Sequence, residues 1–107
     1  MISVKVFFRA DNIVSVSTEG HSGYADAGAD IVCAAVTSAV RFVDAVLNDT
    51  LGLGTPVSVD EEIALIKIDA PADISAAQPV FTAFWRLMCE YSTEYPANIQ
   101  VITMEVQ

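Results

Sequence analysis

The residues of this chain that could carry out a reaction are a histidine and a cysteine that lie close together in the sequence. His21 is the single histidine, and Cys33 follows it twelve residues later. A cysteine thiolate attacks carbonyl carbons, and an imidazole within reach can take the thiol proton and return it to a leaving group. The pair therefore indicates thiol-dependent nucleophilic chemistry, which this spacing permits without demanding it.

The segment that contains Cys33 is predicted to be the start of a helix. Asp30 has the side chain of a good N-cap, and apolar residues follow it at helical spacing to about Leu47. With Asp30 as N-cap, Cys33 takes the third helical position, where unpaired amides and the helix dipole favour a thiolate. A plainer interpretation stays open, because Asp30 puts a negative charge near the sulfur and a cysteine among apolar residues is most often an inert buried thiol.

The remaining elements are two hairpins, a second helix and a last strand. Residues Glu19 to Asp30, before the first helix, hold three of the five glycines and are predicted to be a mobile loop. Alternating or short apolar runs predict strands at residues 2–8, 13–17, 57–59, 63–68 and 99–104. Helical spacing predicts a second helix from Ser75 to about Tyr91. The order β-β-α-β-β-α-β predicts an α+β fold with two helices packed on a mixed or antiparallel sheet.

Length and composition limit the function further. The 107 residues have the size of one domain, and 53% of them are hydrophobic, which excludes a disordered chain. Fourteen acidic and five basic residues give a formal charge of −9, which is incompatible with the basic surface of a nucleic-acid-binding protein. The longest uncharged stretches are shorter than the roughly 20 residues that span a bilayer, so no membrane-spanning helix is expected. The N-terminal segment alternates and lacks the apolar stretch of a signal peptide, so a cytoplasmic location is expected.

The other reactive or apolar side chains favour structural roles. Cys89 lies in the second predicted helix among apolar residues, so it is expected in the core. Glu61 and Glu62 are expected to be solvated hairpin residues, and a metal site or a carboxylate hydrolase would need a second acidic cluster that the sequence lacks. The first helix is apolar most of the way round, so both of its sides should be buried. A second subunit is one candidate for covering the side that the sheet does not reach.

Two segments around His21 and Cys33 resemble the ribosomal-processing cysteine protease family, often called Prp. The segments are Gly20-His21-Ser22-Gly23-Tyr24-Ala25 and Gly28-Ala29-Asp30-Ile31-Val32-Cys33-Ala34-Ala35-Val36. The resemblance implies that His21 and Cys33 are the catalytic pair, with no cofactor and no metal. It implies supporting roles for Asp30, which matches the family's aspartate, and for Thr37, which replaces the usual serine four residues after the cysteine. The loop expected to close over the substrate contains Gly20, Ser22, Gly23, Tyr24 and Gly28.

The resemblance also implies a substrate and an assembly. The family consists of cytoplasmic, dimeric bacterial proteases that remove a short N-terminal extension from a large-subunit ribosomal protein, the twenty-seventh of that series. The cleaved bond follows aromatic residues and precedes an alanine and lysines. An acidic enzyme attracts such a lysine-rich peptide. In the expected mechanism His21 deprotonates Cys33, the thiolate attacks the scissile carbonyl, and amides of the first helical turn stabilise the oxyanion.

Two other functions fit the same residues. A non-catalytic dimeric module could hold a basic ribosomal tail or an assembly factor in an acidic groove. A redox-sensing thiol protein would need a resolving cysteine near Cys33, and Cys89 on the other helix is poorly placed for that role. The enzyme and the binding module share an expected partner, a basic peptide, and neither is expected to contact nucleic acid or a membrane.

Overall fold

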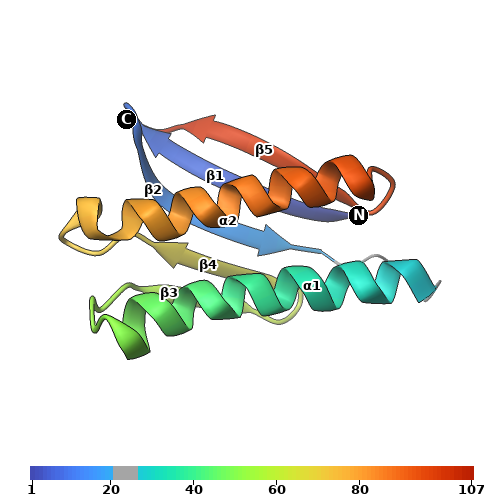
Figure 1. Ribbon diagram of the computed structural model, residues 1–107, viewed down its shortest axis with the longest axis horizontal. Coiled ribbons are helices and arrows are strands. Elements are labelled where there is room, and N and C mark those ends of the chain that lie inside the picture. The colour runs from blue at the N-terminus through green and yellow to red at the C-terminus, as the bar shows by residue number, and fades with distance from the viewer. Residues whose placement is uncertain (21–26) are drawn as a thin grey trace.

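The computed structural model of the protein describes residues 1–20 and 27–107, except for the side chains of residues 27–30. The elements are, in chain order, β1 (Ile2–Arg9), β2 (Asn12–Glu19), α1 (Ala27–Asp44), the π-helical turn η1 (Ala45–Thr50), β3 (Val57–Asp60), β4 (Leu65–Asp69), α2 (Ile74–Glu94) and β5 (Ile99–Glu105). The strands form one sheet, and both helices lie on the same face of it (Figure 1). The predicted α+β architecture and order of elements are confirmed.

The sheet has the strand order β3-β4-β2-β1-β5. The pairs β1–β2, β2–β4 and β3–β4 are antiparallel, whereas β1 and β5 are parallel, so the sheet is mixed. This order brings the second hairpin next to β2, which places β4 beside the strand that leads toward the first helix. The β3–β4 hairpin and the start of α1 are therefore neighbours in space although they are far apart in sequence.

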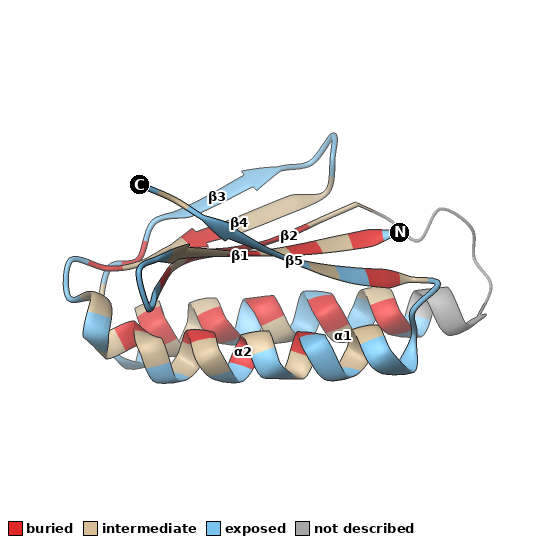
Figure 2. Cartoon of the chain, turned by 90° about the horizontal axis from the view of Figure 1, so that it is seen from above, coloured by how far each residue is buried: buried red, intermediate tan, exposed pale blue. Residues whose placement is uncertain are grey.

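The hydrophobic core lies between the sheet and the helix layer (Figure 2). Strand β1 buries Val4 and Val6 on the helix side, and the alternate residues lie on the open face, as the period of a strand requires. The helices contribute buried side chains at helical spacing. These are Val32, Val36, Val40 and Val43 on α1, and Ala77, Phe81, Phe84 and Met88 on α2.

The first helix is less completely buried than its sequence predicts. On the side away from the sheet, Ile31 and Phe42 expose 62% and 69% of their surface. A single chain therefore leaves this side of α1 uncovered, and its burial by a second subunit stays a prediction. Contrary to the expectation from the uncharged stretches, Ile31–Thr50 has the length and composition of a membrane span, although its buried valines pack on the sheet.

Polar side chains join the layers and the strands. The Gln78 side chain on α2 accepts a hydrogen bond from the Ile13 amide and donates one to the Ile13 carbonyl, both at 2.8 Å. Ile13 follows an irregularity in the β1–β2 pairing between Phe7 and Phe8, so Gln78 satisfies backbone groups where the ladder is interrupted. This contact fixes α2 against the first hairpin.

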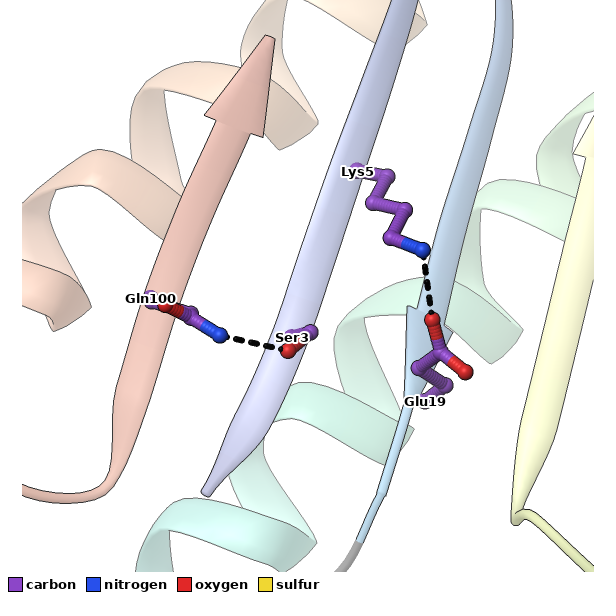
Figure 3. Close-up of polar contacts among 4 residues, drawn as sticks. All are labelled: Ser3, Lys5, Glu19 and Gln100. Atoms are coloured by element: carbon purple, nitrogen blue, oxygen red, sulfur yellow. Dashed lines mark hydrogen bonds and ion pairs between the residues drawn. The ribbon is translucent and has the colours of Figure 1, made fainter.

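The open face of the sheet carries cross-strand polar contacts (Figure 3). Lys5 on β1 forms an ion pair with Glu19 on β2, with Nζ and Oε1 2.8 Å apart. On the other side of β1, Gln100 of β5 donates a hydrogen bond to the Ser3 hydroxyl at 2.8 Å. These contacts connect the three strands at the end of the sheet where β2 leads toward α1.

The approach to β3 is fixed by a single asparagine. Asn48, in η1, donates to the Asp44 carboxylate at 2.7 Å and to the Thr55 carbonyl at 3.2 Å, and it accepts a bond of 2.6 Å from the Thr55 amide. The loop between η1 and β3 is thus tied back onto the end of the helix. The second hairpin then turns at residues 61–64, so Ile63 lies in the turn and not in the predicted strand.

Candidate active site

A groove between α1 and the β3–β4 hairpin contains Cys33. It has a volume of about 330 Å³ and opens to solvent. Residues from four parts of the chain line it: Ile2, Thr18, Glu19, Gly20, Cys33, Val36, Thr37, Val59, Asp60, Glu61, Ala64, Leu65 and Ile66. Most of these side chains are apolar, and the acidic ones lie in the hairpin and at the end of β2. The groove can therefore hold apolar side chains of a ligand beside a thiol, with carboxylates close by.

Cys33 lies on α1 at the boundary between the core and the groove. Its side chain is half-buried and packs against the hydrophobic core, and it is a thiol rather than part of a disulfide. A sulfur in this position is reachable from the groove while its helix is held rigidly by the buried Val32 and Val36. Such rigid support is what a nucleophile needs, because the reacting atoms have to be aligned closely.

The predicted start of the helix is wrong. The helix α1 begins at Ala27, so Asp30 lies inside its first turn and is not the N-cap, and Cys33 is in the second turn. From the second turn onward each amide bonds to the carbonyl four residues earlier, so the amides near Cys33 are already used within the helix. The unpaired amides of the first turn therefore lie about one turn before Cys33, and their role as an oxyanion site stays a prediction. The misplacement arose because the glycine-rich composition before Asp30 predicts a loop, whereas the helix extends through Gly28.

Thr37 lies one helical turn after Cys33 and lines the same groove. Residues four apart on a helix lie on the same face, and the Thr37 side chain is exposed. Its hydroxyl is a hydrogen-bond donor on the side of α1 that faces the groove. The structure therefore places this predicted supporting residue next to the predicted nucleophile along the groove.

Gly20 directly follows β2 and has a conformation that only glycine adopts easily. Its φ is +94°, and a Cβ at this position would approach the Met1 carbonyl oxygen to 2.7 Å. Its amide donates a hydrogen bond to the Ile63 carbonyl in the hairpin turn at 3.0 Å. The backbone is thus fixed between the N-terminus and the second hairpin at the residue directly before His21.

The other predicted site residues lie mostly outside the described part of the chain. His21, Ser22, Gly23 and Tyr24 are all outside it. Gly28 lies within α1 by its backbone. The pairing of His21 with Cys33 and the substrate loop therefore stay predictions, while Cys33, Thr37 and Gly20 are shown to border one groove.

The acidic hairpin residues at this groove were missed as site residues by sequence reasoning. Asp60 and Glu61 line the groove, whereas the sequence indicated an ordinary solvated turn. Nothing in their local spacing points to Cys33, because their proximity comes from the pairing of β4 with β2. Among residues 1–20 and 27–107, no three histidine, cysteine or acidic side chains form a cluster that could hold a metal ion.

The second cysteine is not where the sequence predicts it. Cys89 is exposed on α2 instead of lying in the core. The buried stripe of α2 runs through Phe81, Phe84 and Met88, so the next residue points away from it. Cys89 does not line the groove of Cys33.

Comparison with known proteins gives a consistent family assignment. The model of the family described as cysteine protease Prp matches residues 1–100. No curated protein sequence matches the chain. The crystal structure of SMU.848 from Streptococcus mutans has a TM-score of 0.87 and 25% identity, covering 99% of this chain and 96% of that one.

A second solved structure shares the fold at lower identity. It is an essential ribosomal processing protease, Prp, from S. aureus in complex with a substrate peptide. Its TM-score is 0.84 at 19% identity, with 96% of this chain and 99% of that chain covered.

Proposed function

The chain belongs to the Prp family of cysteine proteases, and from this premise we propose that it removes the N-terminal extension of a large-subunit ribosomal protein, the twenty-seventh of that series. The observation that carries the proposal is Cys33 on a rigid helix at the side of an open groove with an apolar lining and acidic residues. Such a groove suits a peptide in which aromatic residues are followed by lysines.

The chemistry that we propose uses Cys33 as nucleophile and His21 as general base and acid. His21 takes the proton of the Cys33 thiol, and the thiolate adds to the scissile carbonyl carbon. As the peptide C–N bond breaks, the imidazolium returns the proton to the leaving amine, and a thioester with the N-terminal fragment stays on the enzyme. Water deprotonated by His21 then attacks the thioester, which releases a carboxylic acid and restores the thiol.

The charge that develops on the carbonyl oxygen needs hydrogen-bond donors. The unpaired amides of the first turn of α1 lie about one turn before Cys33, which is in the second turn. The Thr37 hydroxyl is a donor on the correct face of the helix. We propose that it supports the reaction by donating to the substrate backbone, since threonine retains the hydroxyl of the family's serine.

Mass spectrometry tests the proposal most directly. A synthetic peptide that spans the N-terminal extension and first lysines of the host's ribosomal protein is incubated with the unaltered protein and with Cys33→Ala. We expect a single cut after the aromatic residues with the unaltered protein and none with the variant. If neither protein cuts although both bind the peptide, the chain is a binding module for a basic ribosomal tail, and the proposed cleavage is wrong.

We also propose that the enzyme works as a homodimer in the bacterial cytoplasm, where ribosomal subunits assemble. The dimer is supported by an apolar groove between the outer sides of α1 and α2, bordered by the exposed ring of Phe42 together with Val46, Val80 and Leu87. An exposed ring beside an apolar groove on the same face is suited to a two-fold interface, in which each copy's ring enters the other's groove. Sedimentation velocity should show a dimer for the unaltered protein and a monomer for Phe42→Glu.

A further inference from the structure

The strand β3 forms one edge of the sheet, and its pairing shows which of its backbone groups face outward. The Asp69 amide points toward the β3 side and donates to the Pro56 carbonyl. The next amide, of Ala70, points the other way and donates to the Val14 carbonyl in β2. Because hydrogen-bonded pairs alternate along an antiparallel ladder, Pro56, Ser58 and Asp60 bond to β4. The amides and carbonyls of Val57 and Val59 therefore point away from the sheet.

Among the described residues, no strand pairs with this outer edge of β3. Edge strands are usually protected by short length, charged side chains, prolines or bulges; β3 is short and ends in Asp60, but it has no lysine, proline or bulge within its four residues. The side chains of Val57 and Val59 lie on the helix side, opposite the helix-facing Ile68 and Ile66, yet they expose 38% and 64% of their surface. The edge is therefore both unpaired in its backbone and apolar in its side chains.

This edge is continuous with the groove of Cys33. Val59 and Asp60 line the groove together with Cys33 and Thr37. The edge is also held in position before anything binds, because Asn48 ties its N-terminal approach to the helix and the hairpin turn accepts the Gly20 amide. A preorganised edge loses little conformational freedom on pairing with a further strand.

We propose that the substrate peptide binds as an added strand on the outer edge of β3, through backbone hydrogen bonds with Val57 and Val59. The inference deepens the proposed function, on which it rests, by assigning the way in which the peptide is held. Alternate side chains of an added strand face the same side, so apolar residues of the peptide join Val57 and Val59 beside the groove. Basic residues of the same peptide are attracted to the exposed carboxylates of the hairpin turn.

Proline substitution tests the backbone contact, because proline has no amide hydrogen. Val59→Pro removes the outward amide and leaves the bonds to β4 in place, since those come from Ser58 and Asp60. Thr103→Pro is the matched control. In the parallel pairing of β5 with β1, the Ile2 amide donates to the Asn98 carbonyl, so every second residue of β5 from Asn98 onward bonds to β1. Thr103 lies between two of these residues, so its amide points outward from β5, at the edge of the sheet opposite β3.

Binding is measured by fluorescence anisotropy with the labelled ribosomal extension peptide, on proteins that also carry Cys33→Ala so that no cleavage occurs. We expect Val59→Pro to weaken peptide binding about fivefold or more, because one hydrogen bond is lost and the peptide strand can no longer approach β3 closely. Thr103→Pro should bind within about twofold of its parent. Equal binding by both variants and the parent, or equal weakening by both, overturns the inference.

A second measurement applies even if Val59→Pro fails to fold. The amides of the peptide are methylated one at a time, and each peptide is tested on the protein that carries Cys33→Ala alone. Methylation of the amide that pairs with β3 should weaken binding about fivefold, whereas unweakened binding by every methylated peptide overturns the inference. Failure of the unaltered enzyme to cut the peptide contradicts the proposed function separately, because binding is measured without cleavage.

Discussion

Cys33 is expected to be the more reactive of the two cysteines, although Cys89 is the more exposed. Cys89 is exposed, whereas Cys33 is half-buried, so accessibility alone would favour alkylation of Cys89. An activated nucleophile reacts as its thiolate, so we expect iodoacetamide to label Cys33 several times faster than Cys89. Peptide mapping of the folded protein after short labelling times measures both rates. Equal or faster labelling of Cys89 would contradict the activation of Cys33.

Gly20 is expected to be needed for the placement of the residue that follows it. In Gly20→Ala, the positive φ costs about 1–2 kcal/mol, and the new Cβ also meets the Met1 carbonyl oxygen, which forces the backbone to shift. We expect a lower free energy of unfolding and at least a tenfold lower kcat. In a His21→Ala background the same substitution should change kcat little, because the group that it displaces is already gone.

Gly52→Ala is the matched control for this variant. Gly52 has a φ of +63°, and nothing lies within 4 Å of a Cβ built there, so the control has the backbone strain without the collision. Urea denaturation and peptide cleavage are measured on both variants. If Gly52→Ala lowers kcat as much as Gly20→Ala, the effect at Gly20 is general destabilisation and not displacement of His21.

At the scale of the elements, hydrophobic periodicity predicted the individual strands and helices. It did not predict which residues are brought together by the pairing of strands. The alternation in β1 and the apolar spacing in α2 are local, so their strands and helices could be predicted within a few residues. The start of α1 could not, because Gly28 has a low helix propensity that the rest of the helix outweighs. The position of Asp60 beside Cys33 could not be predicted either, since it follows from the non-local pairing of β4 with β2.

Asn48 is expected to stabilise the protein by holding the loop before β3. Asn48→Ala removes two hydrogen bonds to the backbone of Thr55, whose side chain is buried, and one to the Asp44 carboxylate at the helix end. We expect the free energy of unfolding to fall by about 1–3 kcal/mol, because the Thr55 backbone groups lose their partners. If the substrate pairs with β3, the KM should also rise more than kcat falls. Chemical denaturation and steady-state cleavage of the peptide measure the two effects.

The neighbouring Asp49→Ala serves as the control for this element, since Asp49 is exposed in the same π-helical turn. It should change the free energy of unfolding by less than about 0.5 kcal/mol, as is usual for exposed residues. Equal destabilisation by both variants would assign the effect to helix propensity and not to the contact with Thr55.

At the scale of the whole molecule, the charge of −9 predicts attraction of a basic substrate, and the fold concentrates part of that charge at the groove. The order of elements and the acidity could be read from composition and periodicity. The location of the acidic rim could not, because it requires the strand order. The fold thus places part of the negative charge of the whole chain beside Cys33.

Neutralising the acidic turn should therefore slow the capture of substrate. With Asp60→Asn, Glu61→Gln and Glu62→Gln combined, we expect kcat/KM for the lysine-containing peptide to fall about three- to tenfold at low salt. These side chains are exposed, so salt screens their attraction, and the difference from the unaltered enzyme should shrink as ionic strength rises. Cleavage rates measured between low and high salt give both the initial difference and its dependence on screening.

A variant with the same net charge separates the local field from the overall one. Asp49→Asn, Glu90→Gln and Glu94→Gln also remove three exposed charges, but these residues do not line the groove. Because exposed charges are screened over about 10 Å at 0.1 M salt, this control should retain kcat/KM within about twofold. If both triple variants lose activity equally, attraction depends on net charge alone, and the acidic hairpin turn has no particular role in guiding the peptide toward Cys33.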